Sequence, residues 1–235
     1  MNIAMWSGPR NLSTAMMYAF GMRRDCAVWD EPFYAAYLAM TDLAHPMRDE
    51  ILAAGEMNPD EVAARLVGAP PDGKMHFYQK HMTHHMIDGI DREWMKQVKN
   101  VFLIRHPSRV IASYAAKRDN PSLDDIGLWQ QAALVDMCDD PIIIDSSNIR
   151  ENPEEMLRAL CAALELPFDP AMLSWPMGGH KDDGVWAPHW YDGVHNSTGF
   201  TQGESALPIL TGTYAALSDE ALPYYQKLAA QKLCA

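Results

Sequence analysis

This sequence lacks both long hydrophobic runs and closely spaced cysteines. No run approaches the roughly 20 apolar residues that a membrane-spanning helix needs, and no basic, apolar leader precedes residue 3. The four cysteines, Cys26, Cys138, Cys161 and Cys234, form no C-x-x-C pair, which favours free thiols over a zinc site or a disulfide framework. We therefore expect a cytoplasmic protein that has no contact with a membrane.

Positive charge is also scarce, because 19 Lys and Arg stand against 31 Asp and Glu, for a net charge of −12. Nucleic-acid binding needs a basic face that displaces counterions, so the charge disfavours it. Any anion site must be local and built from a few placed cations. The 235 residues, 48% of them hydrophobic, contain no repeat or low-complexity linker, so we expect a single domain over residues 1–235.

The first stretch, residues 2–18, has the pattern of a strand, a loop and a helix that together could bind an anion. An apolar run at residues 3–6 predicts a strand, the break after Gly8 predicts a loop that carries Arg10, and Ser13 with Thr14 opens a helix. Backbone N–H groups at a helix N-terminus bind anions, and Arg10 adds a fixed positive charge. The loop does not read G-x-x-x-x-G-K-S/T, because no Lys is present. The alternative is an ordinary helix start after a buried strand, with Arg10 solvated.

A second cation follows the clearest strand, at residues 100–104. Arg105 ends this apolar run, a helix over residues 110–118 follows, and Ser113 lies in its early turns. Metal-dependent nucleotide enzymes usually place an Asp at such a strand end to hold Mg²⁺. We therefore expect no metal here, and the Arg with the Ser suits a second phosphate.

Candidate general bases follow two other predicted strands. Glu31 comes after the short strand at residues 27–29, and His81 and His85 come after the strand at residues 75–80. The histidines match no zinc signature, so one of them as a general base, with Lys80 as an anion clamp, is the better functional interpretation. The alternatives are a solvated loop acid and a surface loop with satisfied histidines.

The remaining segments complete an α/β pattern. Strand, loop and helix alternate in a way that predicts a mainly parallel sheet with helices on both faces. Residues 178–200 are rich in Gly, His and aromatics, which suits a lid over a flat ring or a surface loop that packs its own tryptophans. Other expected elements are helices over residues 34–67 with a break at 45–46, a helix over 124–137, a strand at 141–144, a helix over 156–164, and one or two helices in the last 35 residues.

Four of these segments resemble the sulfotransferase family in order and position. S-G-P-R-N-L-S-T resembles its 5′-phosphosulfate loop, often P-K-S-G-T-T or P-R-S-G-S-T, and R-H-P-S-R-V-I-A-S-Y resembles its 3′-phosphate segment, R-N-P-x-x-V-x-x-S-Y. N-P-E-E-M-L-R-A-L-C-A-A-L-E-L-P-F-D resembles its late helix, and H-K-D-D-G-V-W resembles its C-terminal R-K-G-x-x-G-x-W loop. The matched pieces span residues 2 to about 190.

The resemblance implies a three-layer α/β/α architecture like that of P-loop NTPases, with 3′-phosphoadenosine-5′-phosphosulfate (PAPS) as co-substrate. Glu31 then resembles the acidic base of bacterial and Golgi-type members, whereas His81 matches the base of cytosolic members and His85 is its neighbour. Leu12 replaces a family Gly, and Asp182 with Asp183 departs from the C-terminal motif. Implied donor-binding residues are Pro9, Arg10, Asn11, Leu12, Ser13 and Thr14 in the loop, Arg105 and Ser113 at the 3′-phosphate, and Lys181 in the C-terminal loop.

These observations predict an enzyme that moves a sulfuryl group from PAPS to a hydroxyl or amine of a small molecule. Arg10 and the loop amides would stabilise charge on the leaving oxygen, and Glu31 or a histidine would take the acceptor proton. An ATP-dependent phosphotransferase and a nucleotide-binding module without chemistry remain as alternatives. The sequence predicts neither the acceptor nor the oligomeric state.

Overall fold

The computed structural model describes residues 1–116, 120–201 and 203–234, and its centre is a parallel sheet. The strand order is β2-β3-β1-β4-β5, and every pairing between these strands is parallel. This confirms the predicted fold class. The strands are β1 (Asn2–Ser7), β2 (Cys26–Asp30), β3 (His76–Met82), β4 (Lys99–Ile104) and β5 (Ile142–Asp145).

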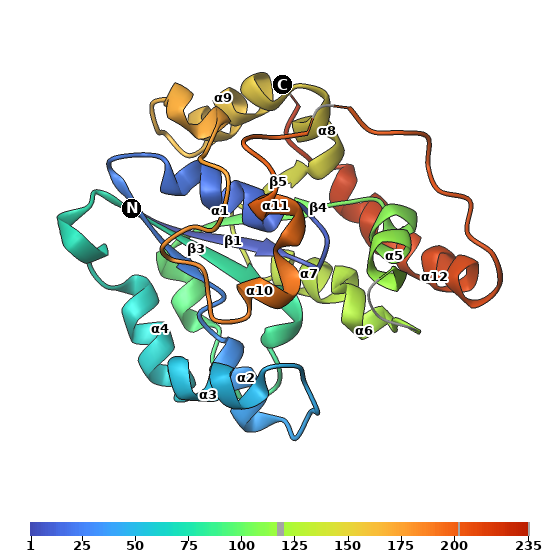
Figure 1. Ribbon diagram of the computed structural model, residues 1–235, viewed down its shortest axis with the longest axis horizontal. Helices are drawn as coiled ribbons and strands as arrows, with labels where there is room; N and C mark the ends of the chain where they lie inside the picture. Colours follow the sequence, from blue (N-terminus) through green and yellow to red (C-terminus); the bar gives the residue numbers. More distant parts are fainter. Residues whose placement is uncertain (117–119, 202, 235) are drawn as a thin grey trace.

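Helices cover both faces of the sheet, which gives three layers (Figure 1). Side chains alternate along a strand, so Ile3 and Met5 of β1 face one cluster of buried residues while Ala4 and Trp6 face the other. The first cluster packs under α1 (Ser13–Gly21), α8 (Ser146–Glu151) and α9 (Pro153–Ala163). The second packs under α4 (Pro59–Val67), α7 (Leu128–Val135) and α12 (Gly212–Ala229).

The other helices lie around the edges of these layers. None of the helices in the described residues is long and apolar enough to cross a membrane. The α-helices are α2 (Tyr34–Met40), α3 (Arg48–Ala54), α5 (Pro107–Ala115), α6 (Leu123–Ile126), α10 (Ala187–Trp190) and α11 (Asp192–His195). The 3₁₀ turns are η1 (Pro71–Gly73), η2 (Thr83–His85), η3 (Glu93–Gln97) and η4 (Pro170–Leu173).

The structure corrects the expected helix over residues 124–137, which is two helices joined at Gly127. Gly127 has a φ of 73°, and a Cβ there would lie 3.2 Å from the Cα of Gly8. Gly127 is the left-handed C-cap of α6, a conformation that favours Gly, and its close approach to Gly8 leaves little room for a side chain. Elsewhere, residues 117 and 118 at the end of the expected helix over 110–118 lie outside the described residues.

Candidate functional site

The loop between β1 and α1 combines two left-handed residues with a helix start that no side chain caps. Arg10 and Leu12 both adopt left-handed conformations, with φ of 61° and 70°. Leu12 is the N-cap of α1, and no side chain caps the first turn. Left-handed residues next to an uncapped helix start are the backbone features on which anion-binding nests are built. Leu12 thus supplies the conformation that a Gly would supply at this place.

Contacts with neighbouring strands fix this loop at the carboxyl edge of the sheet. The buried amide of Asn11 donates to the carbonyl of Leu103 at 3.2 Å, and the Ser146 hydroxyl donates to the carbonyl of Asn11 at 2.9 Å. A Cβ on Gly8 would lie 2.2 Å from the carbonyl oxygen of Ile126. The loop is therefore packed against β4, α6 and α8 with no room for a larger residue at its first turn.

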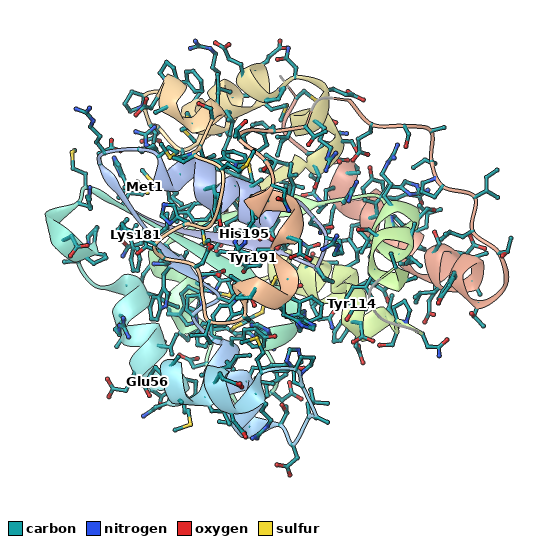
Figure 2. The ribbon with its side chains drawn as sticks, viewed as in Figure 1. Met1, Glu56, Tyr114, Lys181, Tyr191 and His195 are labelled. Carbon is teal, nitrogen blue, oxygen red and sulfur yellow. The ribbon has the colours of Figure 1, made fainter. Side chains whose placement is uncertain are left out.

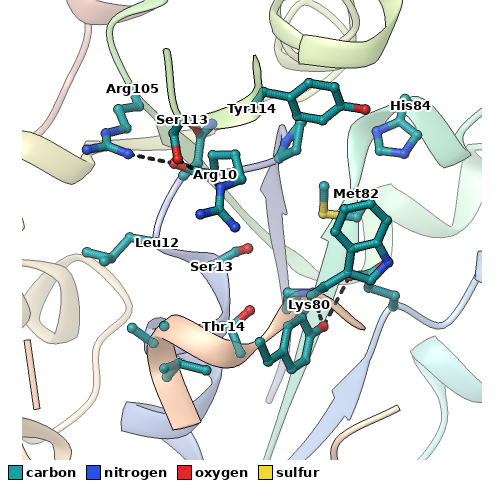
Figure 3. A pocket seen from close by; sticks show the side chains of 18 of the residues that line it. Arg10, Leu12, Ser13, Thr14, Lys80, Met82, His84, Arg105, Ser113 and Tyr114 are labelled. Atoms are coloured by element: carbon teal, nitrogen blue, oxygen red, sulfur yellow. Dashed lines mark hydrogen bonds and ion pairs between the residues drawn. The ribbon is translucent and has the colours of Figure 1, made fainter. Parts of the chain in front are cut away.

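The two predicted cations meet through the loop. Arg105 donates to the carbonyl oxygen of Arg10 at 2.9 Å, and Nε of Arg10 donates to the Ser113 hydroxyl at 2.9 Å (Figure 3). Burial lowers the pKa of Arg10, and the neighbouring charge of Arg105 lowers it further. Like charges held this close favour a shared anionic ligand, which would relieve their repulsion.

A cavity of about 560 Å³ opens along this edge of the sheet. This volume lies within the range that small-molecule sites commonly occupy. Figure 3 shows that the loop residues face the same space as Lys80 and His84, which come from a different part of the sheet edge. The predicted site residues in its lining are Pro9, Arg10, Asn11, Leu12, Ser13, Thr14, Glu31, His85, Arg105 and Ser113.

Glu31 lies at the opposite end of this cavity, in a buried ionic cluster. Nζ of Lys80, whose side chain is 1% exposed, contacts Asp30 at 2.9 Å and also pairs with Oε1 of Glu31. The Tyr191 hydroxyl lies 2.8 Å from Lys80 and 3.2 Å from Oε1 of Glu31. Burial alone would lower the pKa of Lys80, but the two carboxylates outweigh it and raise the pKa.

The other oxygen of Glu31 faces a histidine. Oε2 lies 3.9 Å from Nε2 of His85, whose ring stacks on Tyr34 and Tyr37 with centroids 4.6 and 4.8 Å apart. Burial holds the pKa of His85 well below 6.5, and it lowers the pKa of His84 to about 4. Both rings are therefore neutral near pH 7, so either a carboxylate or a neutral imidazole is available to accept a proton here.

Two predicted site residues are not brought to the cavity. His81 is 2% exposed and stacks on Trp6 at 4.5 Å between centroids, on the other side of β3, where burial lowers its pKa to about 3. Lys181 is exposed, pairs with Asp182 at 2.8 Å, and lies apart from Tyr191 in Figure 2. Side chains alternate along β3, so Lys80 and His81 must point to opposite faces of the sheet. Because Lys80 points into the cavity, His81 cannot do so.

Residues 178–195 are attached to the site by polar contacts that sequence reasoning missed. The Tyr191 hydroxyl donates to Asp30 at 2.8 Å, and the amide of Gly184 donates to the same carboxylate at 3.1 Å. Asp183 accepts from the Tyr18 hydroxyl at 2.7 Å and lies 3.1 Å from His195. Asp183, which departs from the family motif, therefore joins this segment to α1. In the sequence, only the aromatic residues interleaved with Gly in this segment indicated that Tyr191 could reach the site.

The parallel sheet with helices on both faces and the cavity at its carboxyl edge define an α/β protein with a small-molecule-sized site where such folds bind ligands. A family model described as a sulfotransferase domain matches residues 1–232, so the chain belongs to the sulfotransferase domain family. This confirms the resemblance carried by the loop and by the segment from Arg105 to Ser113.

Solved structures share the fold. The sulfotransferase domain of the olefin synthase from Synechococcus PCC 7002 matches with a TM-score of 0.58 and 16% identity, covering 97% of this chain and 94% of that domain. The sulfotransferase domain from the curacin biosynthetic pathway matches with a TM-score of 0.60 and 15% identity, covering 97% of both. At such identity, the likeness shows the architecture and not the substrate.

Two curated proteins of Arabidopsis thaliana are similar to this chain along nearly its whole length. Branched-chain-amino-acid aminotransferase-like proteins 1 and 2 are 37% and 36% identical to it over 230 residues, which is 96% of the chain. The chain spans about two fifths of the length of these relatives, since the match covers 41% of each. The relationship therefore concerns one part of each longer protein.

Proposed function

We propose that this domain transfers a sulfuryl group from 3′-phosphoadenosine-5′-phosphosulfate to a hydroxyl or amine of a small-molecule acceptor. The observation that carries the proposal is that Arg10, Arg105 and Glu31 line one cavity. Two arginines at one end suit the two anionic ends of the donor nucleotide, and a carboxylate at the other end suits an acceptor proton. The family and the fold support a transferase of this kind.

The residues present fit the donor. The left-handed loop and the uncapped first turn of α1 provide N–H groups for the 5′-phosphosulfate, with the hydroxyls of Ser13 and Thr14 beside them. Arg105 contacts the backbone carbonyl of Arg10 and Ser113 contacts its side chain, and we assign both residues to the 3′-phosphate. Oε1 of Glu31 is held by Lys80, which leaves Oε2 for the acceptor.

In the transfer step, the acceptor oxygen or nitrogen bonds to sulfur while the bond from sulfur to the bridging phosphate oxygen breaks. Negative charge grows on that bridging oxygen, where Arg10 and the loop amides stabilise it. Glu31 takes the proton from the acceptor. His85 is the second candidate for the base, because Nε2 of its neutral ring lies 3.9 Å from Oε2 of Glu31. His81 and Lys181 have no part in this assignment because neither lines the cavity.

Isothermal titration with adenosine 3′,5′-bisphosphate, 5′-AMP and ADP tests the donor assignment. The wild-type protein is expected to bind the bisphosphate at least tenfold more tightly than 5′-AMP, because a phosphate paired with arginine contributes about 1.5–3 kcal/mol. Arg105→Ala should remove most of this preference while 5′-AMP binding stays within about threefold. The proposed 3′-phosphate site would be excluded if the wild type bound the bisphosphate and 5′-AMP equally well. It would also be excluded if Arg105→Ala weakened the binding of both ligands by the same factor.

The alternatives predict different results with the same protein. An ATP-dependent phosphotransferase would turn over ATP in the presence of Mg²⁺, and a binding module would bind the bisphosphate yet transfer nothing to a panel of phenols, alcohols and amines. We expect transfer of labelled sulfuryl from the donor to at least one member of that panel, without ATP turnover.

A further inference from the structure

Three arginines converge on a single carboxylate next to the proposed donor site. Glu204 lies in the chain between α11 and α12, and its side chain is 4% exposed. Oε1 lies 2.7 Å from Nη2 of Arg105 and 3.5 Å from Nε of Arg150, while Oε2 lies 2.5 Å from Nε of Arg109. The Ser147 hydroxyl donates to Oε2 at 3.1 Å. Glu204 thus touches the guanidinium group that the proposed function assigns to the 3′-phosphate.

The charge of this cluster does not balance. Three guanidinium groups surround one carboxylate, and burial lowers the pKa of Arg150, with the charge of Arg105 lowering it further. In a chain of net charge −12, such a concentration of cations is a local feature. A phosphate monoester carries a charge close to −2 near pH 7 and would neutralise the arginines better than one carboxylate does.

The hydrogen bonds of this cluster also favour a phosphate over the carboxylate. Nε of Arg105 and Nε of Arg150 are buried and have no hydrogen-bond partner in the described structure. The contact of Arg150 with Glu204 at 3.5 Å is an ion pair without a hydrogen bond. The planar carboxylate of Glu204 has two oxygens, and both are already engaged. A phosphate has three terminal oxygens in a tetrahedral arrangement and can satisfy more of these donors.

The cluster lies at the wall of the cavity. Arg105, Arg150 and Thr201 line the cavity, and Glu204 follows Thr201 by three positions. Departure of the Glu204 side chain would therefore leave Arg105 and Arg150 facing this cavity without their carboxylate partner.

Glu204 belongs to a segment without regular secondary structure. Residues 203–211 contain no helix or strand, and Figure 1 shows the chain running around the outside of the molecule to α12. Gly203 and residues 205–207 are exposed, and backbone contacts tie the start of this stretch to the arginine cluster. Gly203 donates to the carbonyl of Arg150 at 2.8 Å, and Arg109 donates to the carbonyl of Ser205 at 2.5 Å.

We propose that Arg109 and Arg150, with Ser147, complete the 3′-phosphate site around Arg105, and that Glu204 occupies this site as an internal competitor until the nucleotide displaces it. The proposal rests on the proposed function. It adds Arg109, which stands at a variable position of the family's 3′-phosphate segment, and it adds Ser147 and Arg150, which lie outside the four matched motifs. It also makes the affinity for the donor depend on an equilibrium between a bound and a released Glu204.

Titration of Glu204→Gln with adenosine 3′,5′-bisphosphate tests the competitor. We expect binding about tenfold tighter than in the wild type, because the neutral amide competes less well for arginines, and 5′-AMP binding unchanged. Glu220→Gln is the matched control, because it makes the same charge change at an exposed position of α12 and should leave both affinities unchanged. Equal or weaker binding of the bisphosphate by Glu204→Gln would overturn the proposal and would mean that Glu204 positions the arginines.

Two further measurements separate the roles. Arg150→Gln should weaken bisphosphate binding at least tenfold and leave 5′-AMP binding within threefold, and loss of both to the same extent would remove Arg150 from the site. Amide hydrogen exchange at residues 203–211 of the wild type should become faster when the bisphosphate is added, and slower exchange would contradict displacement.

The outcome also distinguishes this inference from the proposed function. A wild-type protein that does not prefer the bisphosphate over 5′-AMP would contradict the proposed function. If the wild type prefers the bisphosphate but Glu204→Gln does not bind it more tightly, only the proposed role of Glu204 as a competitor is contradicted.

Discussion

Three residues of the candidate site hold backbone conformations that L side chains rarely adopt. Arg10, Leu12 and Glu31 have φ of 61°, 70° and 42°, and each follows a strand at the carboxyl edge of the sheet. Each left-handed residue costs about 1 kcal/mol relative to an ordinary conformation. The surrounding contacts must supply this energy, and such strain is concentrated at sites where the placement of a group matters more than stability.

At the scale of single residues, Glu31→Gln tests the proposed base. The amide keeps the size and the contact with Lys80 but cannot take a proton, so the transfer rate should fall about 10²-fold to 10⁴-fold. Binding of adenosine 3′,5′-bisphosphate should stay the same, because Glu31 lies at the other end of the cavity from Arg105. The rate is measured with labelled donor and the first acceptor found in the panel.

His85→Gln is the companion variant, because both base candidates face the same place. A loss below tenfold is expected if Glu31 is the base. A larger loss in His85→Gln than in Glu31→Gln would reverse the assignment and make the neutral imidazole the base.

At the scale of elements, the loop after β1 depends on its close packing with the turn between α6 and α7. Gly8→Ala would place a Cβ 2.2 Å from the backbone oxygen of Ile126, which no side-chain rotation can relieve. We expect the free energy of unfolding to fall by about 2 kcal/mol or more, measured by urea denaturation.

Gly68→Ala is the matched control for that variant. Gly68 has a φ of −69°, and its added Cβ would lie 3.4 Å from the nearest atom, which is ordinary contact. Its stability should be unchanged or higher by about 0.5 kcal/mol, because Ala restricts the unfolded chain. If Gly8→Ala were as stable as Gly68→Ala, the loop would not be held by its contact with Ile126.

At the scale of the whole molecule, buried neutral histidines couple stability to pH. The folded pKa of His81 is about 3, whereas an unfolded His titrates near 6.5. Below pH 6.5 the unfolded chain binds a proton that the folded chain does not, so stability falls as pH falls. His81 alone should lower the free energy of unfolding by about 2 kcal/mol between pH 7.5 and pH 5.

Urea denaturation at several pH values measures this effect. His81→Phe, which keeps a ring on Trp6, should reduce the loss of stability between pH 6 and pH 5 by about 1 kcal/mol, whereas His189→Gln at an exposed position should leave it unchanged. The pKa values of His84 and His85 are also lowered, so these two residues should preserve part of the dependence in both variants. An identical pH dependence in His81→Phe and the wild type would mean that His81 is protonated in the folded protein.

Short-range patterns in the sequence were sufficient to predict the sheet and many of the residues that line the cavity. Apolar runs marked the strands that precede Arg10, Glu31 and Arg105, and parallel strands bring their carboxyl ends to one edge. Side chains that follow such strands must therefore meet, whatever the details of the helices between them. The family followed from the same segments, because its motifs lie where the strands end.

Only the tertiary structure decided which distant residues complete these loops. Nothing in the sequence near Glu204 relates it to Arg150, and Tyr191 reaches Lys80 across more than 100 positions. Alternation along β3 sends Lys80 to the site and His81 to the opposite face, and α6 ends at Gly127, which lies close to Gly8. Which distant residues contact each other depends on the packing between elements. The packing energy is determined by the surfaces that come together, which the local sequence does not specify.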